Sequence, residues 1–427
     1  MTSLVDSLRH CPPAARRLLA GEMAGLLATA STQTTLAWWI AHSGGSGDLA
    51  RHGLVIAVCA MAAMPLLSPM GDRWSKRRVV QAARGLLLLE ALALAMLAGM
   101  DVYSLSTLCF CGALSAVVTA ALAPTQASML PELVGVDRLP DAIRLRRGCQ
   151  AMGGLAGPAV SGALLATDGI AAAMVGALLL TLVAAAAAMW LGPPGVAPTA
   201  AAAGGWLGDM GAGLRAKWRV PVDRWWTLTG ALMMVFFLPA TGMLLPLRLQ
   251  ALGLSGGWLG ACSASLSLGV MAGIAGLADA LIRRLGRVRS IAVAIGVCAG
   301  AMAAAGACAQ PLALLGCYVL MGMCMSVTQL VGQTHRALAV PEHFRSRMAA
   351  AQLALAQLAA SVAPAVAGVL LTLWRVEAVY LCMAMGFLAS GALLLAVPEL
   401  RPFLRLDHEQ VRNWYGRQYP EAFGPRQ

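Results

Sequence analysis

Apolar residues gather in blocks of roughly 18 to 25 positions, close to the ~20 helical residues that cross about 30 Å of hydrocarbon. Short segments with charges, Gly or Pro separate the blocks. The ten-residue alternation typical of membrane barrels is absent, so the blocks are predicted to be α-helices, which satisfy their own backbone groups in lipid. The pattern predicts twelve spans, at residues 18–42, 53–70, 79–99, 104–126, 146–166, 170–192, 226–247, 257–281, 290–309, 312–333, 348–373 and 377–397.

The longest polar interval separates the sixth predicted span from the seventh. Pro193 and Pro194 end the sixth span because proline cannot continue a helix. The Arg- and Trp-rich end of the interval suits a short helix at the headgroup level. The predicted domains are a six-helix bundle at 1–192, a cytoplasmic linker at 193–225, a second six-helix bundle at 226–397 and a cytoplasmic tail at 398–427. The charged tail is expected to be a solvated, weakly helical end.

The two predicted halves repeat each other at a nearly constant offset. The matched pairs are Asp72 with Asp279 and Gln126 with Gln333, each 207 positions apart, Pro158 with Pro364, 206 apart, and Pro131 with Pro341, 210 apart. Two parallel repeats are the architecture of rocker-type transporters, with the substrate site at the midplane between them. The predicted fold class is therefore an all-α membrane protein with twelve transmembrane helices in two pseudo-symmetric six-helix bundles.

The cations that give the chain its formal net charge of +12 are unevenly distributed along it. With the N-terminus in the cytoplasm, the spans leave Arg51, Arg248 and Arg375 as the only outer cations among 31 Lys and Arg residues. This asymmetry orients membrane proteins. It predicts a multi-pass protein of the bacterial inner membrane with both termini in the cytoplasm, in contact with lipid and without a nucleic-acid partner.

Few residues offer chemistry outside the spans. The eleven cysteines stand singly, without CxxC spacing or neighbouring histidines, which predicts no metal and no cofactor. The absence of a His-Glu-x-x-His pair and of a Walker loop argues against an enzyme. A sensor or scaffold would need a larger soluble domain. We expect a monomeric carrier with a small-molecule substrate.

The loop after the second span reads Gly71-Asp72-Arg73-Trp74-Ser75-Lys76-Arg77-Arg78. Glycine permits a tight turn, and the aspartate can accept from free N–H groups at a helix N-terminus. The segment resembles the loop between helices two and three of the major facilitator superfamily, and the segment from Asp279 to Arg287 resembles its second copy. The resemblance implies a cytoplasmic conformational latch formed by Gly71, Asp72, Arg73, Arg77, Arg78, Asp279, Arg283 and Arg287.

The fifth span contains a run of small residues with a central proline, from Gly153 to Gly162. Small residues let a neighbouring backbone approach closely, and proline breaks one bond of the helix ladder. The run resembles the antiporter motif of the same superfamily and recurs in the eleventh span. The resemblance implies a bending and sealing role for Gly153, Gly157, Pro158, Gly162, Pro364 and Gly368.

The fourth span ends in Ala123-Pro124-Thr125-Gln126-Ala127-Ser128-Met129-Leu130-Pro131-Glu132-Leu133-Val134. This exit resembles the branch that contains the bacterial enterobactin exporter and the macrolide-efflux proteins. The resemblance implies secondary active export of a siderophore or similar secondary metabolite by alternating access, coupled to protons. The alternatives are a macrolide-type multidrug efflux pump and, less favoured, a lysolipid translocator or an uptake carrier.

Ionisable residues inside the hydrocarbon are costly and usually functional. Glu22, Thr29 and Gln33 share one face of the first span, and Glu90 lies about 16 Å into the third span at 1.5 Å per residue. Proton coupling or substrate binding is predicted for seven side chains, namely Glu22, Glu90, Thr29, Gln33, Met325, Gln329 and Gln333.

Overall fold

The computed structural model describes residues 12–67, 74–134, 139–167, 169–191, 206–341 and 344–423. Across these ranges the regular structure is helical, without a strand. Nine helical segments there are long and apolar enough to cross a membrane. They are α4 (Lys76–Gly99), α5 (Leu105–Leu133), α7 (Gly169–Met189), α9 (Pro221–Thr241) with α10 (Leu244–Ala251), α11 (Gly256–Ala272) with α12 (Ala278–Leu285), α13 (Arg287–Ala307), α14 (Pro311–Ala339), α15 (Arg345–Leu373) and α16 (Val376–Leu395).

Two further helices hold the remaining predicted spans. The first, α2 (Pro13–Leu67), runs over the first and second predicted spans, and α6 (Leu139–Thr167) runs over the fifth. The backbone of α2 leaves helical geometry at Gly45, with φ of 71° and ψ of −164°. Glycine reaches this positive φ without the steric penalty of a Cβ, so the two spans are separate helices joined at that residue. The all-α membrane fold predicted from the apolar blocks is confirmed.

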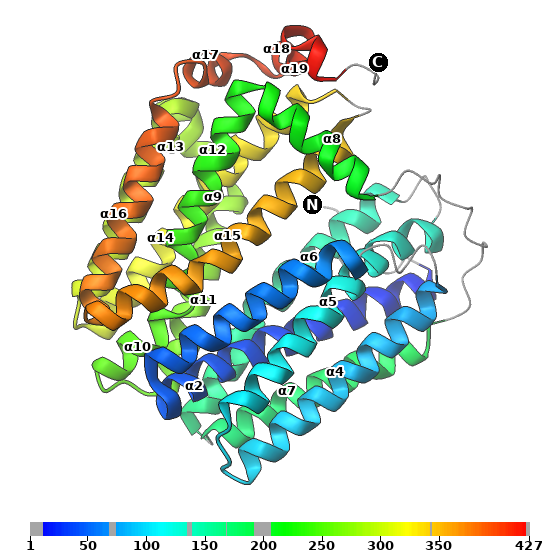
Figure 1. Cartoon of the computed structure of the whole chain (residues 1–427), viewed down its shortest axis with the longest axis vertical. Helices are drawn as coiled ribbons and strands as arrows, with labels where there is room; N and C mark the ends of the chain where they lie inside the picture. The colour runs from blue at the N-terminus through cyan, green and yellow to red at the C-terminus, as the bar shows by residue number, and fades with distance from the viewer. Residues whose placement is uncertain are drawn as a thin grey trace. The chain divides into compact units, whose positions relative to one another are not determined.

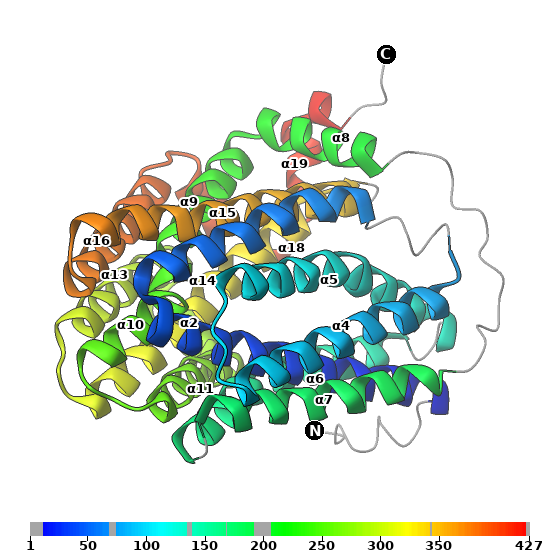
Figure 2. The same ribbon diagram turned by 60° about the horizontal axis from the view of Figure 1, so that its bottom comes forward.

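The chain divides into two compact units. The first comprises Met1–Ala203 with Leu249–Ala264, and the second comprises Gly204–Arg248 with Ser265–Gln427. In the first unit, α2 packs against α5, α6 and α7, and α4 packs against α5 and α7 (Figures 1 and 2). In the second unit, α13 packs against α14 and α16, and α9 packs against α15 and α16. Each unit therefore has its own helical core.

A π-helical turn, η2 (Gly273–Leu277), interrupts the eighth predicted span. Gly276 within it has φ of 125°, and Gly286 between α12 and α13 has φ of 76°. Such π turns mark bends in a helix. The second copy of the predicted latch thus forms α12, a short helix bounded by two glycine-dependent bends.

The predicted linker and tail both pack against the second unit. The described part of the linker forms α8 (Trp206–Arg219), which contacts α9 and α15. The tail forms α17 (Leu400–Arg405), α18 (His408–Val411), α19 (Trp414–Gln418) and η4 (Pro420–Ala422). Phe403 and Tyr415 are fully buried and stack on each other, with ring centroids 5.7 Å apart. The expectation of a solvated tail is wrong, because its aromatic residues supply an apolar face.

Candidate functional site

Glu22 of α2 is buried in the first unit, with only 4% of its surface exposed. The guanidinium of Arg146 on α6 binds its carboxylate in a bidentate pair, with Nε 2.8 Å from Oε2 and Nη2 2.7 Å from Oε1. One turn further along α6, the amide nitrogen of Gln150 donates to the same Oε1 at 2.8 Å. Bidentate pairs of this kind are strong and fix the geometry of both partners. The α2–α6 contact is thus locked by a charged cluster.

A second cation reaches the same place from α4. Arg84 is buried, its Nη2 donates to the carbonyl oxygen of Gly21 at 3.1 Å, and its charge acts on Glu22. A side chain at Gly25 would occupy the volume of the Arg84 guanidinium. Glycine at position 25 is therefore what lets the cation lie against α2. We name Glu22, Arg84, Arg146 and Gln150 the Glu22 cluster.

The other acidic and polar candidates of the first unit lie apart from this cluster. The Thr29 hydroxyl donates to the carbonyl of Gly25 at 2.8 Å, and Gln33 is exposed. Glu90 is buried on α4, where it pairs with the Ser115 hydroxyl of α5. The structure therefore brings together Glu22 and its cations, but does not join them to Thr29 or Gln33 through a described contact.

The small residues of α6 serve close packing within the first unit. A side chain at Gly153 or Gly157 would meet the α2 backbone, and one at Gly162 would meet the backbone of Gly260. The Ser31 hydroxyl of α2 donates to the carbonyl of Gly157 at 2.8 Å, next to Pro158. In α15, Pro364 likewise lies inside the helix, four residues before Gly368.

The predicted latch residues are only partly described. Gly71, Asp72 and Arg73 lie outside the described residues, whereas Arg77 and Arg78 open α4, which is capped by the Ser75 hydroxyl. In the second copy, Asp279 and Arg283 are exposed on α12 and form no ion pair in the described part of the chain. Arg287 instead donates to the carbonyls of Leu404 and Leu406, at 3.2 and 2.8 Å. This arginine fastens the start of α13 to the tail.

The second unit contains a cavity of about 730 Å³ bounded by α9, α13, α14, α15 and α16. Its wall combines apolar, polar and charged side chains. They include Trp226, Met233, Met234, Met325, Gln329, Met348 and Phe387, together with Lys217, Asp223, Arg336 and Gln352. Met325 and Gln329, two of the binding candidates named from the sequence, both line this cavity. The side chain of Gln333 lies outside the described residues.

A buried carboxylate anchors the charged end of this cavity. Asp223 is fully buried and accepts from Lys217 Nζ at 2.8 Å and from Arg336 Nε at 2.6 Å. Thr227 accepts from Arg336 at 2.7 Å and donates to Gln352 at 3.1 Å. Every residue of the set has at least one hydrogen-bond partner within it, which a buried network requires. We name Lys217, Asp223, Thr227, Arg336 and Gln352 the Asp223 cluster.

The Asp223 cluster contains two cations for one carboxylate. Burial, reinforced by the neighbouring Arg336, lowers the pKa of Lys217 to about 8, against the attraction of Asp223. The tail adds Tyr415, whose hydroxyl lies 3.5 Å from Asp223 Oδ1. Burial raises the pKa of Tyr415 well above its usual value, so the phenol stays neutral. With Lys217 protonated, the Asp223 cluster carries a net charge of +1.

The sequence from residue 18 to residue 311 matches the model of the family described as the Major Facilitator Superfamily. The chain belongs to this superfamily. It is accordingly a multi-pass membrane protein and a secondary transporter. No curated protein matches it in sequence.

Solved transporter structures share its fold at low sequence identity. The nucleoside transporter NupG aligns with a TM-score of 0.73 and 13% identity, over 90% of this chain and 99% of its own. A peptide transporter of the POT family, solved in complex with alafosfalin, aligns with a TM-score of 0.72 and 13% identity, over 95% and 100%. A third structure, the POT family transporter PepTSo, aligns with a TM-score of 0.71 over 93% and 99%, also at 13% identity.

Sequence reasoning found Glu22 of the first cluster and no member of the Asp223 cluster, although two predicted residues, Met325 and Gln329, line the cavity beside it. Arg146 and Gln150 are spaced by four and therefore share a helix face, a signal that could have nominated them as partners for a buried acid. Arg84 interrupts an apolar run and met the same criterion as Glu90. Lys217 and Asp223 were assigned to the linker, where burial was not expected.

Proposed function

We propose that this superfamily member exports an acidic, amphiphilic small molecule, with a siderophore or similar secondary metabolite as the favoured cargo. The observation that carries the proposal is the surplus positive charge of the Asp223 cluster in the wall of a cavity of about 730 Å³. A carboxylate, catecholate or hydroxamate anion would balance that charge. Desolvated cations bind such groups through charge-assisted hydrogen bonds.

The remaining wall of the cavity supports an amphiphilic rather than a small polar cargo. Met233, Met325 and Met348 line the same cavity as Trp226, and methionine adapts to irregular apolar shapes. The same methionines favour a second candidate, efflux of lipophilic drugs of the macrolide type. The two candidates differ in charge, because a cationic drug would be repelled by Arg336 and Lys217.

We further propose that protons drive export through the Glu22 cluster. A proton on Glu22 would neutralise the carboxylate and remove its attraction for Arg146, which loosens α6 from α2. The buried bidentate pair between these two side chains supports this role, because the Glu22 carboxylate is the group through which Arg146 ties α6 to α2. Placement in the bacterial inner membrane, with both termini cytoplasmic, belongs to the same proposal.

The experiment tests cargo charge with inverted membrane vesicles from cells that overproduce the protein. An acidic iron chelator and its neutral methyl ester are compared as competitors of chelator uptake into wild-type vesicles. The acid should compete about ten- to a hundredfold better than the ester, the range expected when a charged hydrogen bond is lost. A cationic macrolide should compete poorly.

A variant links that preference to the cavity. Arg336→Gln should reduce the preference for the acid towards that of the ester, whereas Arg224→Gln, which alters an arginine stacked on Trp218 and Trp225, should leave it unchanged. Equal competition by acid and ester in the wild-type protein would exclude an acidic cargo. Stronger competition by the macrolide would move the assignment to drug efflux.

A further inference from the structure

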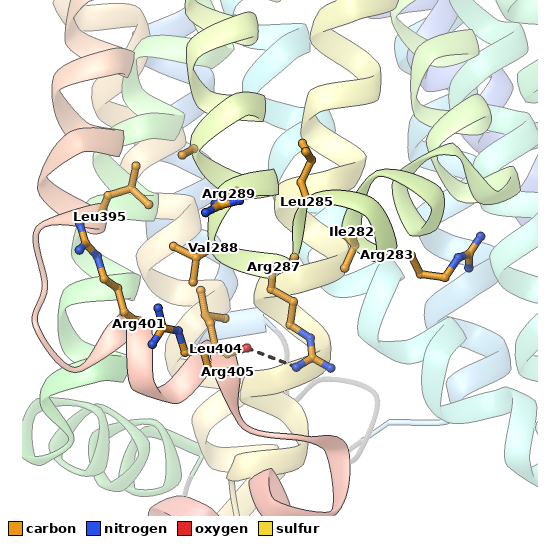
Figure 3. A pocket seen from close by; sticks show the side chains of 12 residues that line it. Ile282, Arg283, Leu285, Arg287, Val288, Arg289, Leu395, Arg401, Leu404 and Arg405 are labelled. Atoms are coloured by element: carbon orange, nitrogen blue, oxygen red, sulfur yellow. Dashed lines mark hydrogen bonds between the residues drawn. The ribbon is translucent and has the colours of Figure 1, made fainter.

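A second pocket lies apart from the substrate cavity, where α12, α13 and α17 meet the end of α16 (Figure 3). Its volume is about 750 Å³. Five arginines line it, together with aliphatic side chains, and none of its lining residues is acidic. The arginines are Arg283, Arg287, Arg289, Arg401 and Arg405.

The pocket is built by the fold rather than by loose surface chains. Arg287 donates to the carbonyls of Leu404 and Leu406 and so joins the first turn of α13 to α17. Buried Leu400 and Phe403 hold α17 in place. Arg401 and Arg405 therefore lie on one face of α17 at a spacing of four, where like charges repel. A bound anion would offset that repulsion.

The backbone adds to the positive potential of the same place. Helix α13 begins at Arg287, and its N-cap residue, Gly286, has no side chain to cap the first amide groups. Gly286 lines the pocket. Free amide groups and the helix dipole at an N-terminus attract phosphate. In Figure 3 the guanidinium of Arg283 points away from α13 and α17, which leaves Arg289, Arg401 and Arg405 as the side chains able to clamp an anion.

The aliphatic part of the wall indicates what the anion is attached to. Val288, Leu395 and Leu404 lie beside the arginines, at the level where the spans α13 and α16 end. A ligand that suits both halves has a phosphate group and hydrocarbon chains. We propose that this pocket binds the phosphate headgroup of an anionic phospholipid, whose chains lie along α13 and α16. Basic pockets at helix ends commonly recognise such headgroups.

The test uses the full-length protein in detergent and a fluorescent short-chain phosphatidylglycerol, with phosphatidylcholine as the neutral probe. The wild-type protein should bind phosphatidylglycerol far better, and salt should weaken the binding. The triple variant Arg289→Gln/Arg401→Gln/Arg405→Gln should bind it about a hundredfold more weakly, since each arginine near an anionic surface contributes roughly a fivefold factor. Circular dichroism and the melting temperature establish that the variant is folded.

A matched triple variant separates the pocket from general surface charge. Arg284→Gln/Arg375→Gln/Arg412→Gln removes three exposed arginines that do not line the pocket, and it should bind phosphatidylglycerol as the wild type does. An equal loss in this control, or equal binding of the two lipids by the wild type, would overturn the proposal. Full displacement of the lipid by millimolar inorganic phosphate would also overturn it, because the site would then recognise a free anion.

Discussion

The Glu22 and Asp223 clusters solve the same physical problem in two different ways. Each buries one carboxylate near two cations. Glu22 is bound by side chains of α6, and the second cation, Arg84 of α4, bonds the neighbouring carbonyl of Gly21, so all these residues are parts of spans. Asp223 is bound by Arg336, by Lys217 of α8 and by Tyr415 of the tail. Along the chain, α8 precedes the second set of spans and the tail follows it. The first cluster is thus internal to a bundle, whereas the second depends on its peripheral segments.

The internal repeat makes this difference informative. Arg146 and Gln352 lie 206 positions apart, the offset that relates Pro158 to Pro364. Equivalent positions of the repeat thus belong to a buried charged cluster in both units, with a guanidinium in one and an amide in the other. The helices are repeated while the charges are not. This division suits a carrier in which one half handles protons and the other handles the cargo.

The largest expected effect separates the two clusters by stability. Asp223→Asn leaves Lys217 and Arg336 buried without a counter-charge and should lower the free energy of unfolding by about 3–5 kcal/mol. Thermal unfolding in detergent measures the loss. Asp223→Asn/Lys217→Met should recover part of it, because one uncompensated cation is removed. Asp279→Asn, at an exposed position of α12, serves as the control and should change little. If Asp223→Asn and Asp279→Asn have the same melting temperature, the Asp223 network does not stabilise the second unit.

A second prediction sharpens the functional contrast. Glu22→Gln keeps an acceptor for Arg146 but cannot take up a proton, so it should abolish the protonophore-sensitive part of transport in vesicles. Its effect on the melting temperature should be smaller than that of Asp223→Asn. Glu90→Gln is the matched control, since Glu90 is also a buried carboxylate but pairs with the neutral Ser115. Retained protonophore sensitivity in Glu22→Gln would exclude Glu22 from proton coupling. Loss of that sensitivity in Glu90→Gln would assign the coupling role to Glu90.

The fold could be predicted from the sequence because lipid imposes a simple rule on segment length and polarity. The clusters could not be predicted in the same way. Asp223 lies just before the start predicted for the seventh span, and Arg336 lies just beyond the end predicted for the tenth. In the structure α9 begins at Pro221 and α14 continues to Ala339. Polar residues at helix ends disappear in a hydropathy average, although neighbouring segments can bury them.

The tail is a second region whose burial could not be predicted from the sequence pattern. Its charges at Arg401, Arg405 and Arg412 indicated a solvated end, and those side chains are indeed exposed. The apolar residues Leu400, Phe403 and Leu404, spaced as one face of a helix, nevertheless form a buried face on one short helix. A helix of one or two turns is too short for its periodicity to stand out against a charged background. Burial of the tail therefore required knowledge of what lies next to it.

The smallest expected effect tests whether the two clusters are energetically separate. Tyr415→Phe removes the hydroxyl that lies 3.5 Å from Asp223 but keeps the ring that stacks on Phe403. The loss should be about 0.5–1.5 kcal/mol of unfolding free energy, the net contribution of one hydrogen bond. Tyr419→Phe, at a half-buried tail position without a contact to Asp223, should have a smaller effect.

Double-mutant cycles then give the decisive comparison. Tyr415→Phe combined with Asp223→Asn should be less than additive, because the carboxylate that the phenol contacts is already gone. Combined with Glu22→Gln, it should be additive, since Tyr415 and Glu22 belong to different compact units with separate polar networks. Measurable coupling to Glu22 would mean that the Glu22 and Asp223 clusters share one stability unit, and the proposed assignment of separate roles to the two halves would then fail.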